Sequence, residues 1–182
     1  MVIWHSFVIS HSSFVIMLTP LKAKTFQASG ARFTIVASRY NERYVDAMVK
    51  AATEELERAG ATDMQIVRVP GAYEIPVVAA RLARESSVHA ARITRHAARR
   101  AAIICLGVIL RGETVHAAHI GEAVSRALME IQVEHEVPVI HEVLLLENEE
   151  QARARCLDPK HNRGREAAQT ALTMAQVMAG LR

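Results

Sequence analysis

The segment RGETVHAAH, from Arg111 to His119, holds the clearest indication of chemistry in this chain. It offers a glycine and several backbone amides near the start of a helical pattern, a geometry that binds anions and above all phosphate. It is not a P-loop, because the lysine and the full glycine spacing are missing. His116 follows these amides, and a histidine can donate or accept a proton near neutral pH. The segment therefore predicts proton transfer beside a phosphate, with a surface or capping histidine as the alternative for His116.

His116 and His119 are also three residues apart, a spacing that could hold a metal ion on one face of a helix. No nearby carboxylate or cysteine completes such a site. We therefore predict that the chain binds no metal.

Three further segments carry residues that could hold a ligand. SRYN (38–41) follows an apolar run and presents Tyr40, an aromatic side chain that a tight turn does not need. VPGAYEIP (69–76) supplies a glycine turn and Glu74 at a helix start, where the helix dipole alone would also favour a carboxylate. The loop RARCLDPKHNRG contains arginines, of which Arg155 is one, that could close a phosphate site as a charged fork. A solvated basic loop is the alternative for this last segment.

The elements that must position these residues alternate regularly from Arg32 onward. We predict strands at residues 33–37, 64–70, 101–109 and 137–146. We predict helices at residues 41–60, 74–86, 122–135, 148–156 and 164–182. Strands alternating with helices indicate a parallel sheet covered on both faces. The predicted fold is thus an α/β three-layer αβα sandwich with a four-stranded parallel sheet, of the flavodoxin-like type.

In such folds ligands bind beyond the carboxyl ends of the strands. The segments described above follow those ends, so we expect them to form one site. Together they offer an aromatic face, a carboxylate, backbone amides, a histidine and an arginine. These groups suit a flat, hydrogen-bonding heterocycle beside a phosphorylated small molecule.

Composition narrows the class of protein. The 182 residues suffice for one domain with a core, and the formal net charge of +3 is small and scattered, which argues against a nucleic-acid partner. The basic stretch ARITRHAARR (91–100) is typical of an arginine-rich amphipathic helix face. No apolar stretch is long enough to span a membrane. Cys105 and Cys156 stand far apart, and Cys105 lies in an apolar run, which indicates reduced thiols and a cytoplasmic location.

Residues 1–30 differ in character from the remainder. They contain the near-repeat HSFVIS and HSSFVI and lack the basic start and cleavage site of a signal peptide. We expect them to be a disordered extension or the product of a mis-assigned start, with Met17 as the alternative first residue. The domain is then expected to span residues 31–182.

The motifs SRYN, VPGAYEIP, LGVILRGETVH (106–116), VPVI (137–140) and the R…NRG pattern (155–164) occur in this order. In them the chain resembles the 6,7-dimethyl-8-ribityllumazine synthase family over about residues 31–182. The resemblance implies a transferase of riboflavin biosynthesis. It would condense 5-amino-6-(D-ribitylamino)uracil with 3,4-dihydroxy-2-butanone 4-phosphate, release phosphate and water, and need no cofactor.

The resemblance also implies a role for each matching position. His116 would be the catalytic, proton-transferring residue. The pyrimidine substrate would be bound by Tyr40, Ala72, Tyr73, Glu74, Val108, Ile109, Leu110 and His141. The butanone phosphate would be bound by Glu113, Thr114 and Arg155. In this family the site forms between neighbouring subunits of a homopentamer, and some members build an icosahedral shell of pentamers. The resemblance also makes riboflavin synthase a candidate partner.

Two departures from the family pattern leave alternatives open. AAHIGEA follows His116 where the family has an aromatic and acidic stretch, and His141 stands where an aromatic residue is common. One alternative is therefore a non-catalytic shell protein that binds lumazine or flavin. Another is a different phosphosugar enzyme on the same type of sandwich, which would be indifferent to the pyrimidine.

Overall fold

The computed structural model describes residue 28, residues 30–87 and residues 100–181. The strands are β1 (Arg32–Ser38), β2 (Asp63–Val69), β3 (Arg100–Leu110) and β4 (Val139–Leu146). The longer helices are α1 (Glu42–Arg58), α2 (Ile75–Ser86), α4 (His116–His135) and α6 (Arg163–Gly180). Three short helical segments are η1 (Ala72–Glu74), α5 (Glu149–Ala152) and η2 (Arg153–Leu157).

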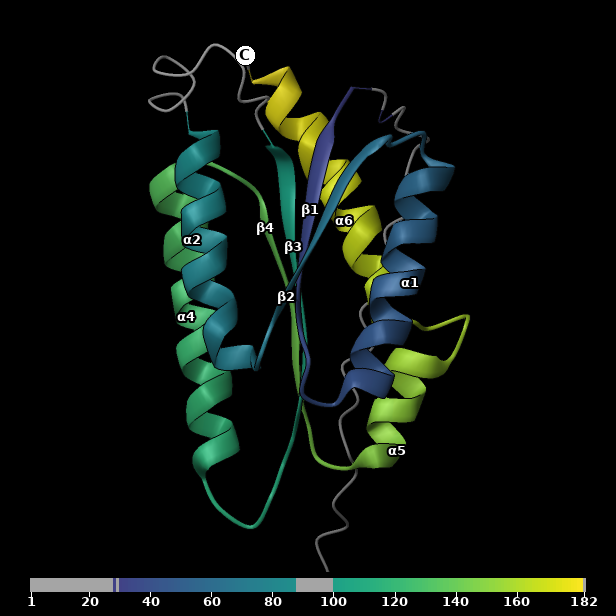
Figure 1. Cartoon of the computed structure of the whole chain (residues 1–182), viewed down its shortest axis with the longest axis vertical. Helices are drawn as coiled ribbons and strands as arrows, with labels where there is room; N and C mark the ends of the chain where they lie inside the picture. The colour runs from purple at the N-terminus through teal and green to yellow at the C-terminus, as the bar shows by residue number, and fades with distance from the viewer. Residues whose placement is uncertain (1–27, 29, 88–99, 182) are drawn as a thin grey trace, which may run out of the picture.

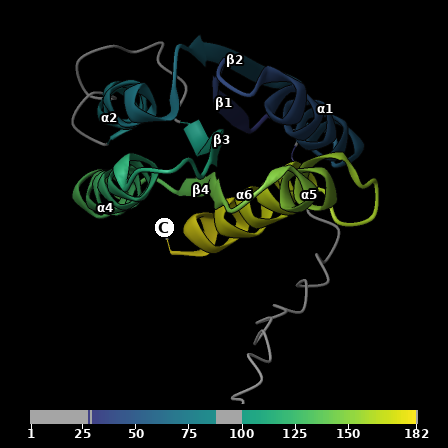
Figure 2. The same ribbon diagram turned by 90° about the horizontal axis from the view of Figure 1, so that it is seen from below.

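The four strands form one parallel sheet in the order β2-β1-β3-β4. Helices α2 and α4 cover one face, and α1, α5 and α6 cover the other (Figures 1 and 2). The predicted three-layer α/β sandwich is therefore confirmed. The carboxyl ends of the strands meet at the lower end of the molecule in Figure 1. The loops that carry the predicted ligand-binding segments leave the sheet at this end.

Alternation along β3 explains why both faces of the sheet are covered. Ile103 and Cys105 belong to the core beneath α2 and α4, whereas Ile104 and Leu106 belong to the core beneath α1 and α6. Side chains along a strand point to opposite faces in turn, so a strand buried on both sides reads as the continuous apolar run found here.

Two predicted helices differ from those observed. Helix α4 begins at His116 and not at residue 122, so Gly121 lies inside it. The space suits a small residue, because a Cβ at Gly121 would lie 3.6 Å from the Leu145 side chain. The predicted helix 148–156 ends as α5 at Ala152 and continues as the π-helical turn η2.

The predictions for the N-terminal extension and for the basic stretch fall mostly outside the described residues. Ala28, near the end of that extension, is buried in the core, and its backbone N–H donates to the Ala59 carbonyl at 2.8 Å. Arg100, the last residue of the basic stretch, is the first residue of β3. None of the described helices is long and apolar enough to cross a membrane.

Both cysteines are free and buried, which predicts slow reaction with thiol reagents. Burial raises the pKa of the Cys105 thiol well above its ordinary range, and burial with the nearby Glu142 charge raises the pKa of Cys156 to about 11. Only about one Cys156 thiol in a thousand is then a thiolate at pH 8. We expect both thiols to react with Ellman's reagent about a hundredfold more slowly in the native protein than in urea. Rapid native reaction of either thiol would contradict this burial.

Candidate active site

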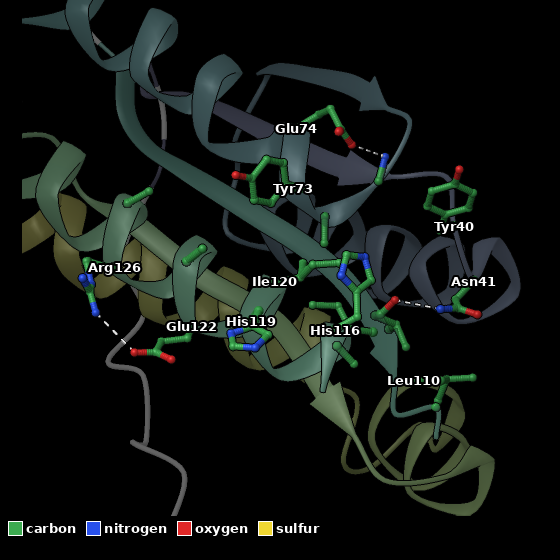
Figure 3. A pocket seen from close by; sticks show the side chains of 18 of the residues that line it. Tyr40, Asn41, Tyr73, Glu74, Leu110, His116, His119, Ile120, Glu122 and Arg126 are labelled. Atoms are coloured by element: carbon green, nitrogen blue, oxygen red, sulfur yellow. Dashed lines mark hydrogen bonds and ion pairs between the residues drawn. The ribbon is translucent and has the colours of Figure 1, made fainter. Parts of the chain in front are cut away.

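A pocket of about 1290 Å³ opens beyond the carboxyl ends of β1, β2 and β3 (Figure 3). Its other wall is the face of α4. Nine of the predicted ligand-binding and catalytic residues line it: Tyr40, Ala72, Tyr73, Glu74, Val108, Ile109, Leu110, Thr114 and His116. The parallel sheet brings them together because the ends of neighbouring strands lie at one edge.

The turn after β1 places Tyr40 at this edge. Its backbone N–H donates to the Pro70 carbonyl at 3.1 Å, which joins the end of β1 to the end of β2. Asn41 takes a left-handed backbone conformation (φ 57°), which asparagine tolerates better than most residues, and its Nδ2 donates to the Val108 carbonyl at 2.8 Å. Tyr40 is left 71% exposed, so its ring is free to lie against a ligand.

Glu74 has the two roles that the sequence left open. Its Oε2 accepts a hydrogen bond from the Gly71 backbone N–H at 2.9 Å, which caps the start of η1. It also lines the pocket. A Cβ on Gly71 would lie 2.9 Å from that oxygen and 3.0 Å from the Tyr40 ring. Because Gly71 has no side chain, both the Tyr40 ring and the Glu74 carboxylate can lie against its backbone.

The start of α4 forms one end of the pocket. Thr114 and His116 line it, and the Thr114 hydroxyl accepts a hydrogen bond from the His116 backbone N–H at 3.4 Å. Val115 is the N-cap residue of α4, and its side chain makes no capping hydrogen bond. The backbone amides that follow His116 in the first turn of this long helix are thus available to an anion such as phosphate.

One face of α4 extends the pocket further than the sequence indicated. His119, Glu122, Arg126 and Glu130 all line it, at the spacing of three to four residues that defines a helix face. Arg126 Nη2 donates to Glu122 Oε1 at 3.2 Å. The sequence did not indicate the last three residues, because they lie in the predicted helix 122–135 and no signal marked which face of that helix lines a pocket.

Three predicted residues lie outside this pocket in the single chain. Glu113 does not line it, although its neighbours do. His141 lies on β4 and contacts Ser125 of α4. Arg155 is exposed on η2, on the side of the sheet that α1 and α6 cover. The fold of one chain therefore does not bring His141 or Arg155 to the other nine residues.

The pocket can do chemistry through a small set of groups. It contains an aromatic face at Tyr40, a carboxylate at Glu74, free helix amides and an imidazole at His116. Within the described ranges, no three histidine, cysteine, aspartate or glutamate side chains converge as metal ligands. Fold and site together define a parallel α/β sandwich protein with a pocket beyond the carboxyl ends of its strands, lined by apolar side chains and a few polar ones.

Comparison with known proteins narrows this class to one family. The sequence model of the 6,7-dimethyl-8-ribityllumazine synthase family matches residues 30–179. Proteins of that name from Xanthomonas campestris pv. campestris (strain B100) and Xanthomonas oryzae pv. oryzae (strain PXO99A) are 39% and 37% identical over 150 residues, which cover 81% of this chain and 90% of each relative. The one from Xylella fastidiosa (strain M12) is 39% identical over 152 residues, covering 82% and 91%. The chain belongs to the 6,7-dimethyl-8-ribityllumazine synthase family.

Proposed function

We propose that this protein condenses 5-amino-6-(D-ribitylamino)uracil with 3,4-dihydroxy-2-butanone 4-phosphate to 6,7-dimethyl-8-ribityllumazine, as a transferase of riboflavin biosynthesis. The observation that carries the proposal is that Tyr40, Glu74 and His116 line the same pocket. It is large enough for two small substrates at once. The two buried cysteines favour a cytoplasmic location.

Each group of residues has a task in this reaction. The pyrimidine ring lies against Tyr40, with Ala72 and Glu74 on its polar edge and ribityl chain. Residues 108–110 hold the other ring edge through backbone groups. The phosphate lies at the amides of Glu113 and Thr114, at the start of α4.

The chemistry proceeds through proton transfers. The 5-amino group attacks the ketone, and water leaves to give a Schiff base. Phosphate is then eliminated, and the ring closes with loss of a second water. We assign these proton transfers to His116, since a histidine side chain can act as a general acid or base. Holding both substrates together supplies much of the acceleration.

We further propose that His141 and Arg155 complete the pocket of a neighbouring subunit. Both are exposed, and neither reaches the pocket of its own chain. In a homopentamer or a shell of pentamers with one site at each subunit contact, His141 and Arg155 of one subunit would line the pocket of the next. Sedimentation velocity tests this arrangement, and a monomer at micromolar concentration would contradict it.

The reaction is tested by mixing the protein with both substrates without metal and following the fluorescent product against a control without enzyme. We expect clear acceleration. Replacing His116 with alanine should lower kcat by only about tenfold, below the usual contribution of a general acid or base, because the binding of both substrates remains. Complete loss of turnover with both substrates still bound would contradict this division of labour.

Arg155→Ala distinguishes the phosphate from the pyrimidine. It should raise KM for the butanone phosphate and leave KM for the pyrimidine nearly unchanged, because it removes only a charged partner of the phosphate. If the wild-type protein binds the pyrimidine tightly but forms no product, it is instead the non-catalytic shell protein.

A further inference from the structure

Ser125 and His141 form a hydrogen-bonded pair between α4 and β4. Ser125 Oγ lies 2.8 Å from His141 Nε2 and 2.7 Å from the Gly121 carbonyl oxygen. On the other side of the ring, the Val143 backbone N–H donates to His141 Nδ1 at 3.3 Å. Ser125 and His141 are both exposed, so the imidazole remains accessible to a ligand or to another subunit.

These contacts decide which nitrogen of His141 carries the hydrogen. A backbone amide can only donate, so Nδ1 must be unprotonated to accept from Val143. In the neutral ring the hydrogen is then on Nε2, which donates to Ser125 Oγ. The serine hydroxyl in turn donates to the Gly121 carbonyl, as helix hydroxyls commonly do four residues back.

The same argument excludes a nucleophilic serine. A serine is activated when the facing histidine nitrogen can accept its proton. Here that nitrogen is Nε2, which already carries a hydrogen. The pair therefore orients the imidazole and does not activate Ser125.

We propose that Ser125 is a positioning residue that holds His141 as a neutral Nε2–H imidazole, the form in which His141 contacts the pyrimidine substrate. The inference rests on the proposed function, in which His141 reaches the pocket of a neighbouring subunit. A fixed, neutral ring can lie against a flat heterocycle without the cost of removing a charge from water.

The charges around His141 favour this neutral form. Its strand partner on β3 is Cys105, whose thiol is neutral because burial raises its pKa. The next residue, Glu142, is paired with Arg163 of α6, the helix on the opposite face of the sheet. On α4, the charged residues Glu122 and Arg126, on either side of Ser125 in the sequence, pair with each other and line the pocket.

Protonation of His141 opposes this arrangement. Partial burial of the ring lowers its pKa. Protonated Nδ1 can no longer accept from Val143, so the bond is lost as the pH falls through that lowered pKa. The unfolded chain takes up this proton at a higher pH than the native chain, so the free energy of unfolding also decreases as the pH falls. KM for the pyrimidine is therefore expected to rise at acid pH.

Steady-state kinetics of a double-mutant cycle tests the proposal. Ser125→Ala should raise KM for the pyrimidine by about threefold to tenfold, the range of one lost hydrogen bond, with a smaller change in kcat. Ser125→Thr, which keeps the hydroxyl, should restore most of the affinity. In a His141→Phe background, Ser125→Ala should have no effect on KM, and the acid rise in KM should disappear.

Thr170→Ala is the matched control. Thr170 is exposed, and its hydroxyl donates to the Glu166 carbonyl four residues back, as Ser125 does to Gly121, while no histidine of the described residues hydrogen-bonds to it. It should leave both constants unchanged. An equal rise in KM for Ser125→Ala with and without His141 would show that Ser125 only supports α4, and would overturn the proposal.

Nitrogen-15 NMR of the ligand-free protein with ring-labelled histidine gives a readout that needs no activity, with His141→Phe assigning the signals. We expect the Nε2–H form of His141 at pH 7.5 in both proteins, because the Val143 amide still faces Nδ1, and a shifted Nε2 signal in Ser125→Ala, because Nε2 has lost the hydroxyl that faces it. An Nδ1–H form, or an Nε2 signal unaffected by Ser125→Ala, would overturn the positioning role. If the wild-type protein makes no lumazine while the NMR result holds, the proposed reaction fails, and with it the pyrimidine contact, but not the role of Ser125 in holding the ring.

Discussion

Replacing Gly164 with alanine is expected to lower the free energy of unfolding by about 3 kcal/mol, at the upper end of the usual cost of overpacking. Gly164 lies in the first turn of α6, where that helix crosses α1. A Cβ there would lie 2.0 Å from the Met48 carbonyl oxygen and 2.6 Å from its carbonyl carbon. A Cβ has no rotamer with which to avoid a backbone atom, so the two helices would have to separate.

Separation would also disturb the bonds that hold the start of α6. Asn162 Oδ1 accepts from the Gly164 backbone N–H at 2.9 Å, and Asn162 Nδ2 donates to the carbonyls of Ala47 and Cys156. Since native domains are stable by only about 5–15 kcal/mol, the loss should be visible as a lower urea midpoint. Circular dichroism measures it directly.

Gly180→Ala provides the control for this experiment. Gly180 ends the same helix, and nothing lies within 4 Å of the Cβ that alanine would add. The free energy of unfolding of Gly180→Ala should stay the same or rise slightly, because alanine favours helix more than glycine does. An equal loss of stability in both variants would contradict the proposed backbone contact at Gly164.

Gly71→Ala is expected to reduce kcat/KM by about a hundredfold, the scale of an ångström-sized displacement in a site, while the fold remains intact. The added Cβ would lie 2.9 Å from Glu74 Oε2 and 3.0 Å from the Tyr40 ring. Both contacts are the ends of side chains, which can move without opening the core. The change would thus displace the aromatic face and the carboxylate together. The backbone angles of Gly71 (φ −134°, ψ −179°) are ordinary for alanine, so backbone strain does not contribute to the expected loss of kcat/KM.

Two measurements separate this effect from unfolding. The urea midpoint of Gly71→Ala should stay close to that of the wild-type protein, whereas the rate of lumazine formation should fall. Gly180→Ala again serves as control and should retain full activity. Normal turnover in Gly71→Ala would show that the positions of Tyr40 and Glu74 beside Gly71 have no role in the reaction.

Sequence alone determined the fold and most of the pocket. Short apolar runs separated by helical patterns are sufficient to indicate a parallel sandwich, and β3 was recognisable because burial on both faces leaves a continuous apolar run. The ends of parallel strands meet at one edge, so the order of the motifs was enough to group Tyr40, Glu74 and His116. Helix starts were less certain, because Gly121 interrupts the helical pattern of α4 without ending the helix.

Only the tertiary structure decided how side chains approach one another. The close approach of Gly164 to the Met48 backbone depends on where α1 and α6 cross, and no local pattern encodes a crossing point. The hydrogen-bonded pair of Ser125 and His141 depends on the phase of α4 relative to the edge strand β4. Arg155 lies within the π-helical turn η2, away from the pocket of its own chain, and the position of this turn is set by packing with distant residues and not by its neighbours in sequence.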